Sequence, residues 1–452
     1  MIGFDYGTSN CAMAVMQDGT PNVLTLGEHG RYMASSLYSP SRDIIVNWLY
    51  NNLPSPHQTE FLNKRRYLIG LGKDELSELK LDGIDTHLSF GKEALNRYLD
   101  DPSEGYYIKS PKSFLGSTGL QPSQIAFFEH IVAAMMLEVK NLAEQNLQHD
   151  LTQVVIGRPI NFQGRHGEES NRQAIEVLTN AAKDVGFKDI EFQFEPVAAG
   201  FEYEATLEKE TRVLVVDIGG GTTDCSMILM GHNKKESINR EEDLLGHSGK
   251  RIGGNDFDIQ LALKQFTHHL GSQTRLLSGK PMPLNSYHEA VAINNLYAQS
   301  QFYSDKNGRF LNDLLLDVEQ PDIFKRLIKV YNNKLSYQLV NNAEQAKINL
   351  SDVESSVIDL SYLASGLSQQ ISQQDFAEST ERELIAISEL MTDAIEQANT
   401  QPDVIFVTGG TARSPIIHDY LSNEFKQIPI VVGDHFGSVT SGLARWAETI
   451  FR

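Results

Sequence analysis

The chain has 452 residues, 40% of them hydrophobic and 22% charged, and a formal net charge of −20. This length suits two to four domains with real cores, and no window approaches the roughly 20 apolar residues that a membrane span needs. The acidic charge disfavours binding to nucleic acid, and we interpret the basic cluster Lys64 to Arg66 as solvated surface. Asp5 interrupts the apolar N-terminus, so we expect no signal peptide, no membrane anchor and a cytoplasmic protein.

Strand-like and helix-like segments alternate along the chain, which predicts an α/β architecture with buried sheets. Runs of β-branched and aromatic residues predict strands at Val23 to Leu26, Gln153 to Gly157, Ile190 to Phe194, Arg212 to Val216, Ser226 to Met230 and Asp403 to Val407. Helical apolar spacing predicts helices at Pro122 to Gln145, Arg172 to Val185, Val197 to Ala205, Ser379 to Ala398 and Ser414 to Phe425.

Two segments richer in polar and helical residues, 31–118 and 255–372, look like insertions into two similar cores. The domain hypothesis is therefore a lobe I over 1–208, with its core at 1–30 and 119–208. Lobe II covers 209–452, with its core at 209–254 and 373–452. The duplication is thus expected to involve whole domains.

Two distant stretches share one pattern, an apolar run into an aspartate, glycine and hydroxyl residues. They are MIGFDYGTSNCAMAV at 1–15 and RVLVVDIGGGTTDCSMILM at 212–230. A glycine-rich turn after a strand presents backbone N–H groups that can cradle phosphate, and an aspartate beside a polyphosphate requires a cation such as Mg²⁺. A hairpin whose aspartate caps its own turn would explain one copy, but two copies disfavour it. Neither a Walker P-loop nor the dinucleotide G-x-G-x-x-G is present.

Three further stretches are weak signals when each is taken alone. DVIFVTGGTARSP at 403–415 is a strand, a glycine pair and a helix start, which lets the backbone approach a flat or anionic ligand. EPVAAG at 195–200 and GGNDFD at 253–258 complete the set.

In this order the stretches resemble the ATPase region shared by actin, sugar kinases and the DnaK-type (seventy-kilodalton) heat-shock chaperones. FDYGTSN and DIGGGTTDCS resemble its phosphate loops, IGRPINF a core strand, EPVAAG a connecting helix, RIGGNDFD a domain-crossing loop, NAEQAKINLS an adenine-facing helix and VTGGTARSP an adenosine loop. The resemblance covers essentially the whole chain and is closest to the short YegD-type heat-shock-like proteins. It implies an actin-like ATPase fold with two duplicated ribonuclease-H-like lobes, inserted subdomains and an interlobe nucleotide cleft.

The resemblance also implies roles for individual residues. Asp5 and Asp217 would hold Mg²⁺ through its waters, and Asp224 would aid cation binding on the phosphate side. Glu195 would place the attacking water together with Asp217, and Thr222 would bind the terminal phosphates. The other residues expected to contact ATP or ADP are Gly7, Thr8, Ser9, Asn10, Gly219, Gly220, Gly221, Thr223, Gly253, Gly254, Glu344, Lys347, Ile348, Ser351, Gly409, Gly410, Thr411, Arg413 and Asp434.

One departure from the family pattern concerns catalysis. Leu95, in FGKEALNR, occupies the position of a lysine that contacts the terminal phosphate in the chaperones. Lys92, Lys109 and Lys112 are near in sequence, and one of them could substitute for the missing lysine, but a surface lysine is the favoured interpretation of each. Because the site would then lack a cation, we expect hydrolysis to be slow. Ile348 replaces an arginine that stacks on adenine, which removes a cation–π contact.

The expected function is that of an ATP-binding, slowly hydrolysing, Mg²⁺-dependent and chaperone-like ATPase. Since the resemblance ends near Arg452, we expect a monomeric nucleotide-dependent switch for an unknown protein partner or client, without a peptide-binding domain. The alternatives are a small-molecule kinase of the same superfamily and an actin-like filament protein. Between Asp258 and Glu344 the chain is about 50 residues longer than the family pattern. These additional residues could contact a partner or form an irregular loop on the surface.

Overall fold

The computed structural model describes residues 1–102, 105–162, 167–231, 241–433 and 437–451. Internal contacts divide the chain into two compact units. Unit 1 consists of Met1–Arg251, Ser388–Ala412 and Phe425–Arg452, and unit 2 consists of Ile252–Ile387 and Arg413–Glu424. This division follows contact density and groups both large sheets in unit 1, so the lobe boundaries expected from the sequence stay a prediction.

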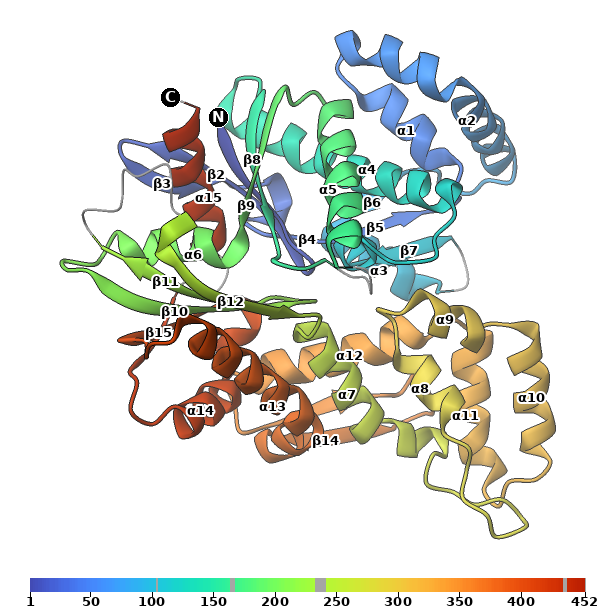
Figure 1. Cartoon of the computed structure of the whole chain (residues 1–452). Helices are drawn as coiled ribbons and strands as arrows, with labels where there is room; N and C mark the ends of the chain where they lie inside the picture. The colour runs from blue at the N-terminus through green and yellow to red at the C-terminus, as the bar shows by residue number, and fades with distance from the viewer. Residues whose placement is uncertain (103–104, 163–166, 232–240, 434–436, 452) are drawn as a thin grey trace. The chain divides into compact units, whose positions relative to one another are not determined.

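The two large sheets of unit 1 repeat one topology, in which an antiparallel three-strand meander is followed by two parallel strands (Figure 1). The first sheet has the order β3 (Thr20–Val23), β2 (Asn10–Gln17), β1 (Ile2–Tyr6), β8 (Gln153–Arg158) and β9 (Asp189–Phe194), and β4 (Met33–Ala34) pairs with β2. The second has the order β12 (Leu244–Lys250), β11 (Thr223–Met230), β10 (Thr211–Ile218), β15 (Val404–Thr408) and β16 (Ile430–Val432). The duplication predicted from the sequence is therefore present at the level of strand order and direction.

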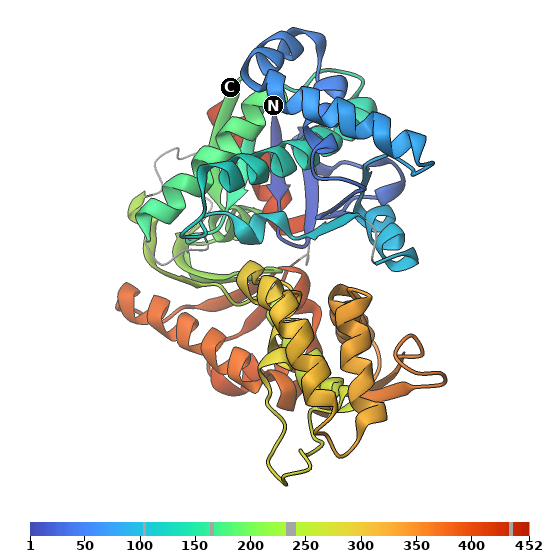
Figure 2. The same ribbon diagram turned by 90° about the vertical axis from the view of Figure 1, so that its right-hand side faces the viewer.

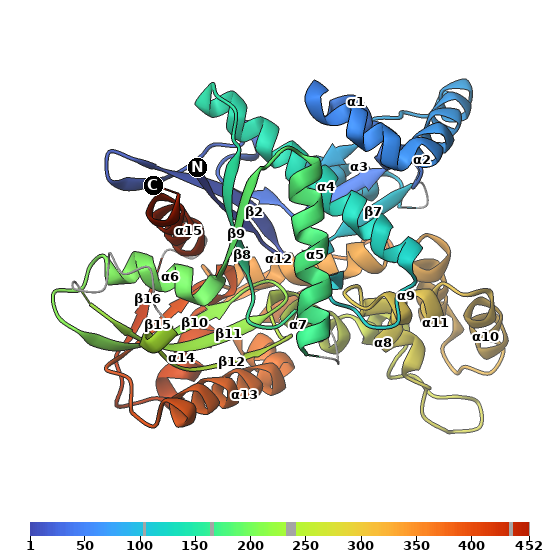
Figure 3. The same cartoon turned by 45° about the horizontal axis from the view of Figure 1, so that its top comes forward.

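A pair of helices lies in the core of unit 1 between these sheets (Figure 3). Helix α6 (Glu195–Glu204) packs on β10 and β11, while α15 (Gly437–Ile450) packs on β1 and β2. The two helices touch at Gly442, where a Cβ atom would lie 1.7 Å from the carbonyl oxygen of Ala198. Only glycine permits this approach, so the helix pair depends on that residue.

The remaining core helices agree with the sequence expectations. Helix α4 (Pro122–Leu147) is buried along its centre and packs with α5 (Glu168–Asp184), and α13 (Gln373–Ala398) and α14 (Pro415–Glu424) follow in the second half. The predicted helices and five of the six predicted strands are confirmed to within a few residues, except that α5 and α13 each begin several residues earlier.

The strand predicted at Val23 to Leu26 is wrong. The strand there is β3, which begins directly after a tight turn with positive φ at Asp18 and Gly19 and ends at Val23. Leu24 and Leu26 are buried although they lie outside any strand. Their apolar character therefore reflects core packing rather than strand pairing.

The insertion at 31–118 contains a three-stranded sheet and a helical hairpin (Figure 2). The strands are β5 (Ser36–Ser39), β6 (Ser89–Phe90) and β7 (Tyr106–Lys109), and the helices are α1 (Ile44–Asn52), α2 (Ser55–Leu81), α3 (Gly91–Asp100) and the 3-10 turn η2 (Pro111–Phe114). Helix α1 packs against both α2 and α4, which attaches the hairpin to the core.

Arg65 corrects the interpretation of Lys64 to Arg66 as solvated surface. Its side chain is only 12% exposed, and its Nη2 lies 2.8 Å from Glu129 Oε1 and 2.7 Å from Asp184 Oδ2. Its Nε donates to His130 Nε2 at 2.9 Å. These bonds join the kink of α2, where Arg65 has non-helical backbone angles, to α4 and α5.

Unit 2 is mainly helical (Figures 1 and 2). It contains α7 (Gly254–Gln265), α8 (Asn285–Val291), α9 (Leu296–Phe302), α10 (Asp305–Leu315), α11 (Pro321–Asn332) and α12 (Ser336–Asn349), and a hairpin of β13 (Ser355–Asp359) and β14 (Ser368–Ser372). The first part of α13 and the whole of α14 also belong to it. Helices α7, α8 and α12 pack on one another. Across the described residues of the whole chain, none of the helices has the length and apolarity that a bilayer span requires.

Candidate active site

The structure brings the two glycine and hydroxyl turns of unit 1 together. The second turn is closed by a hydrogen bond from Gly219 N to Thr222 O at 2.9 Å. A Cβ atom on Gly220 would lie 2.0 Å from Ser9 Oγ, and one on Gly221 would lie 2.8 Å from Thr8 Cγ2. The glycines therefore allow the backbone of one turn to approach the other, as backbone cradles for phosphate require.

A lysine from the insertion enters the same region. Backbone bonds from Ser35 N to Ser9 O, at 2.8 Å, and from Ser110 N to Ser35 O, at 2.7 Å, tie the segment before η2 to the first turn. Lys112 lies in η2 with its side chain 4% exposed, and its Nζ forms an ion pair with Glu195 Oε1. This cation therefore belongs to the interior of unit 1.

The interpretation of Lys112 as a surface lysine is accordingly wrong. Leu95 lies in α3, half-buried, and carries no charge to the site. Lys112, from a different part of the insertion, brings a cation into the interior of unit 1 beside Glu195. The sequence analysis named Lys112 as one of three possible substitutes and favoured the surface for it, because its partner Glu195 is distant in sequence.

Four carboxylates, the buried Asp217, Asp224 and Glu195 and the half-buried Asp5, interact electrostatically with this lysine. Burial is the main cause that raises the pKa of Asp5 and of Asp224 to about 7, and the negative charge of Glu195 adds to it. Burial and the same glutamate raise the pKa of Asp217 well above its usual range. Burial alone would lower the pKa of Lys112, but the attraction of Glu195 and Asp5 outweighs it and raises that pKa.

These groups fit a Mg²⁺ ion that keeps several of its waters. Asp217 and Asp224 are direct cross-strand partners of β10 and β11. Asp224 Oδ1 accepts a hydrogen bond from Ile160 N at 3.0 Å, while its buried Oδ2 has no hydrogen-bond partner among the described residues. No three His, Cys, Asp or Glu side chains of the described chain come together as an all-protein cage. Mg²⁺ uses one or two carboxylates and retains water, so this donor set suits it.

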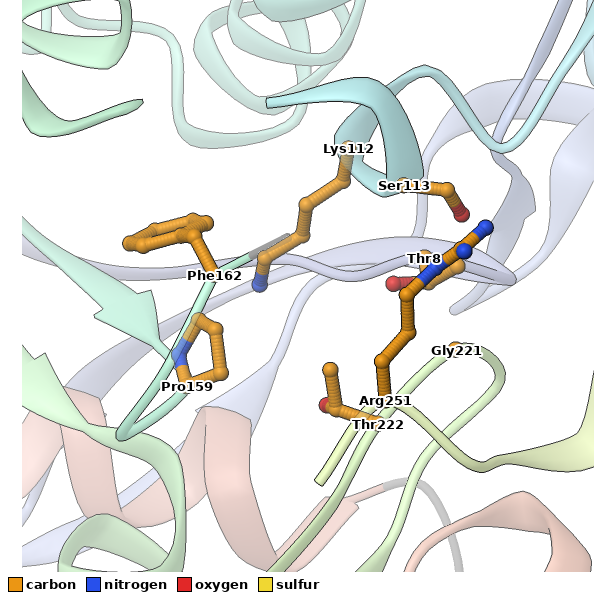
Figure 4. A pocket seen from close by; sticks show the side chains of 8 residues that line it. All are labelled: Thr8, Lys112, Ser113, Pro159, Phe162, Gly221, Thr222 and Arg251. Carbon is orange, nitrogen blue, oxygen red and sulfur yellow. The ribbon is translucent and has the colours of Figure 1, made fainter. Parts of the chain in front are cut away.

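Figure 4 shows a small cavity beside the two turns. It is lined by Thr8, Lys112, Ser113, Pro159, Phe162, Gly221, Thr222 and Arg251. Thr8, Gly221 and Thr222 were expected from the sequence, whereas Lys112 and Arg251 were not. The cavity thus combines two hydroxyls from the turns with two cations.

Other predicted residues of unit 1 lie close to the carboxylates. Gly409, Gly410 and Thr411 follow β15 and enter the 3-10 turn η6 (Gly410–Arg413), and a Cβ on Gly409 would lie 2.9 Å from Asp217 Oδ1. Glu195 is the first residue of α6. Three more of the predicted nucleotide-binding residues, Gly7, Asn10 and Thr223, lie in or beside the two turns.

The predicted nucleoside residues of unit 2 form a separate group. Lys347 Nζ lies 2.7 Å from Asp258 Oδ1 and donates to Gly254 O at 3.1 Å. Ser351 Oγ donates to Lys347 O at 3.3 Å, and Ile348 is 46% exposed on the same helix, α12.

The other residues predicted to contact the nucleoside do not belong to this group. Arg413 pairs with Asp352 at 2.7 Å on an exposed surface of unit 2. Gly253 precedes α7 and Glu344 lies on α12, whereas Asp434 lies outside the described residues. The assignment of these residues to ribose and adenine stays a prediction.

Comparisons with known proteins agree with this arrangement. A family model described as Hsp70 protein matches residues 117–282 and 322–447. The chain is 26% identical over 445 residues to the chaperone protein DnaK of Carsonella ruddii (strain PV), covering 95% of this chain and 59% of that relative. It is 26% identical over 351 residues to the DnaK of Gracilaria tenuistipitata var. liui, covering 76% and 50%, and 27% identical over 264 residues to that of Prochlorococcus marinus (strain MIT 9515), covering 57% and 35%.

The chain spans about half the length of the curated relatives that it matches. The family match covers more than half of the chain, and the duplicated sheets have the actin-like form that the motifs imply. The chain belongs to the Hsp70 protein family and has the actin-like ATPase fold.

Proposed function

We propose that this chain binds ATP with Mg²⁺ and hydrolyses it at the site in unit 1. The observation that carries the proposal is the meeting of the two turns beside the buried Lys112–Glu195 pair. Relatives named chaperone protein DnaK support the choice of an ATP-driven chaperone system.

Each group has a distinct task in the proposed reaction. Thr8 and Thr222 line the cavity from opposite turns and would bind the terminal phosphate through hydroxyl and backbone groups. Lys112 would stabilise the charge that develops on the phosphate oxygens, which is where preorganised donors have most effect in phosphoryl transfer. Glu195 would orient the attacking water together with Asp217.

The carboxylates suit a divalent cation on the phosphate side. Mg²⁺ supplies charge neutralisation between the phosphate oxygens when it is bound. Asp5 and Asp217 would hold its waters from the ends of β1 and β10, and Asp224 would assist through its unpaired oxygen.

Lys112 changes the expectation about rate. Slow hydrolysis was expected because Leu95 carries no charge, and that reason disappears when Lys112 provides the cation. We propose that the rate of ATP hydrolysis depends on Lys112. If hydrolysis is slow, the cause is then something other than a missing lysine.

The finer biological role is also a proposal. We propose that nucleotide binding switches this chain between states that a protein partner distinguishes, and that Gly409 and Gly410 contact the adenosine. We expect these 452 residues to bind no extended apolar peptide tightly, because the resemblance is to the ATPase region. Fluorescence anisotropy with a labelled apolar peptide would refute this if it showed ATP-sensitive micromolar binding.

The deciding experiment is phosphate release from Mg·ATP by wild type and by Asp217→Asn, with no other substrate added. Steady release that the substitution abolishes supports the proposed ATPase. ADP formation without phosphate release, seen only when an acceptor metabolite is added, would favour the small-molecule kinase. ATP-dependent sedimentation would favour the filament protein.

A further inference from the structure

Arg158 is the last residue of β8, and its side chain folds over the turn that follows this strand. Its Nε donates to Pro159 O at 3.2 Å, and its Nη2 donates to Ile160 O at 3.3 Å. The guanidinium also lies 4.7 Å from the ring centroid of Phe194 and 5.8 Å from that of Phe162. Arg158 therefore holds this turn both by hydrogen bonds and by contact with two aromatic rings.

The turn, residues 159–162, forms one wall of the cavity at the candidate active site. Pro159 and Phe162 line the cavity on the same side (Figure 4). Between them, Ile160 N donates to Asp224 Oδ1 at 3.0 Å. The turn thus connects the wall of the cavity to a carboxylate that is expected to assist cation binding.

Arg158 and Asp224 bind opposite ends of one peptide group. The carbonyl oxygen of Pro159 and the N–H of Ile160 belong to the same planar trans peptide unit, so they point in opposite directions. The guanidinium holds the oxygen, and the carboxylate accepts from the N–H. Because consecutive hydrogen bonds polarise one another, the bond from Arg158 both fixes the direction of the Ile160 N–H and strengthens its bond to Asp224.

The surroundings of the turn and of Asp224 favour a single arrangement. Asn171 Oδ1, on α5, accepts from Phe162 N at 2.8 Å, so the turn is held from a second element. On the opposite side, a Cβ atom on Gly249 would lie 2.5 Å from Asp224 Oδ1, so this oxygen is also packed closely against β12. The direction of the Ile160 N–H therefore decides where the other oxygen of Asp224 lies.

We propose that Arg158 is a positioning residue of the magnesium site, which acts through the peptide between Pro159 and Ile160 to hold Asp224 in the orientation that assists cation binding. The proposal rests on the proposed binding of Mg²⁺ with nucleotide. It adds a residue whose side chain need not contact either of them.

The test measures the affinity for ADP by calorimetry, with Mg²⁺ and in EDTA, in wild type and in Arg158→Met. Methionine keeps an unbranched side chain against the two rings but donates no hydrogen bond. We expect the gain in affinity that Mg²⁺ produces to fall about 10-fold, the lower end of the range for residues that orient metal ligands, and the affinity in EDTA to change by less than about twofold. Arg212→Met is the matched control and should keep the wild-type gain, because Arg212 pairs with Asp403 at the opposite end of β10 from Asp217.

A double-mutant cycle separates positioning from packing. If Arg158 acts through Asp224, Arg158→Met should cause no further loss of the Mg²⁺ gain in protein that already carries Asp224→Asn. Additive losses from the two substitutions would overturn the proposal. An equal loss of ADP affinity with and without Mg²⁺ would also overturn it, since that is the result of a merely structural role.

Two outcomes distinguish this proposal from the proposed function. Wild-type protein that binds no ADP would refute the proposed function itself. Wild type with Mg²⁺-dependent binding, together with a variant whose Mg²⁺ gain is unchanged, refutes only the role of Arg158. If Arg158→Met shows no cooperative melting, Arg158→Lys gives the same comparison, because an ammonium lacks the fork of donors that reaches both carbonyls.

Discussion

Lys112 and Glu195 form a buried ion pair that joins the insertion of unit 1 to the first residue of α6. The side chains are 4% and 11% exposed, so neither charge is well solvated. Removing one partner of such a pair leaves the other charge buried and typically costs about 3–5 kcal/mol of stability. The pair therefore fixes the position of Glu195 and holds a cation beside the two turns.

Replacement of Lys112 by methionine tests the catalytic importance of this cation. The substitution keeps most of the volume and removes the charge, so we expect turnover to fall about 100- to 1,000-fold, as when one preorganised donor is lost. Nucleotide binding should persist, because the turns and carboxylates remain. Single-turnover phosphate release and calorimetry with ADP separate the two effects.

Two further variants control for that result. Lys92→Ala removes an exposed lysine of α3 and should leave turnover unchanged. Leu95→Lys should give no gain in rate if Lys112 provides the cation as proposed. A large gain from Leu95→Lys, together with normal turnover in Lys112→Met, would contradict the assignment of Lys112.

The sequence predicted the repeated cores well because the two turns and their flanking strands are local features. Each aspartate and glycine turn lies within one hairpin, and β10 is a nearly continuous buried run that is readily recognised. The equal topology of the two sheets then follows from duplication. The prediction for the N-terminal meander was less accurate, because Pro21 and Asn22 are poor strand formers and nonetheless lie in β3.

Long-range placement explains what the sequence could not predict. Lys112 lies far from both turns in sequence and reaches the cavity through tertiary contacts, whereas Arg251 reaches it because it follows β12, which pairs with β11 beside the second turn. The hydrogen bonds through Ser35 that position η2 have no local pattern. Arg65 was likewise misinterpreted, because its partners Glu129 and Asp184 belong to other helices.

Gly220→Val tests the approach of the two turns. The new Cβ would lie 2.0 Å from Ser9 Oγ and 3.1 Å from Ser9 N, so the first turn would have to move. We expect the melting-temperature rise caused by Mg·ADP in wild type, a mass-action effect of ligand binding, to disappear. Gly70→Ala is the control, because a Cβ at this position of α2 meets no atom within 4 Å. A full ligand shift in Gly220→Val would be incompatible with phosphate binding between these turns.

Gly442→Ala tests the helix pair in the core of unit 1. The added methyl group would collide with the carbonyl oxygen of Ala198, at 1.7 Å, and both α6 and α15 lie between packed sheets that resist displacement. We expect a loss of at least about 1–3 kcal/mol in the free energy of unfolding, the range for overpacking a core. Urea titration measures it, and stability equal to wild type would show that the helices can separate at little cost.

The stability of unit 1 should depend on pH through His130. Burial, assisted by the charge of Arg65, lowers the pKa of His130 to about 3 from an ordinary value of 6.5. Between these values the unfolded chain binds the proton and the folded chain does not, so the free energy of unfolding falls as the pH falls below 6.5. Asp184 acts in the opposite direction, since burial raises its pKa to about 6. Between about pH 6 and pH 4 each group exchanges close to one proton in opposite senses, so the two effects largely cancel, and the net decrease arises mainly between pH 6.5 and 6.

His130→Gln isolates this effect, because Asp184 remains in both proteins. We measure the free energy of unfolding of both proteins by urea titration at pH 7 and pH 5. We expect it to decrease more in wild type than in the variant, by a difference on the order of 2 kcal/mol. His87→Gln is the control, since His87 is 87% exposed and lies outside the Arg65 cluster. Parallel pH profiles for wild type and His130→Gln would mean that His130 accepts a proton in the folded protein, and the bond from Arg65 Nε to its ring would then have to be absent in solution.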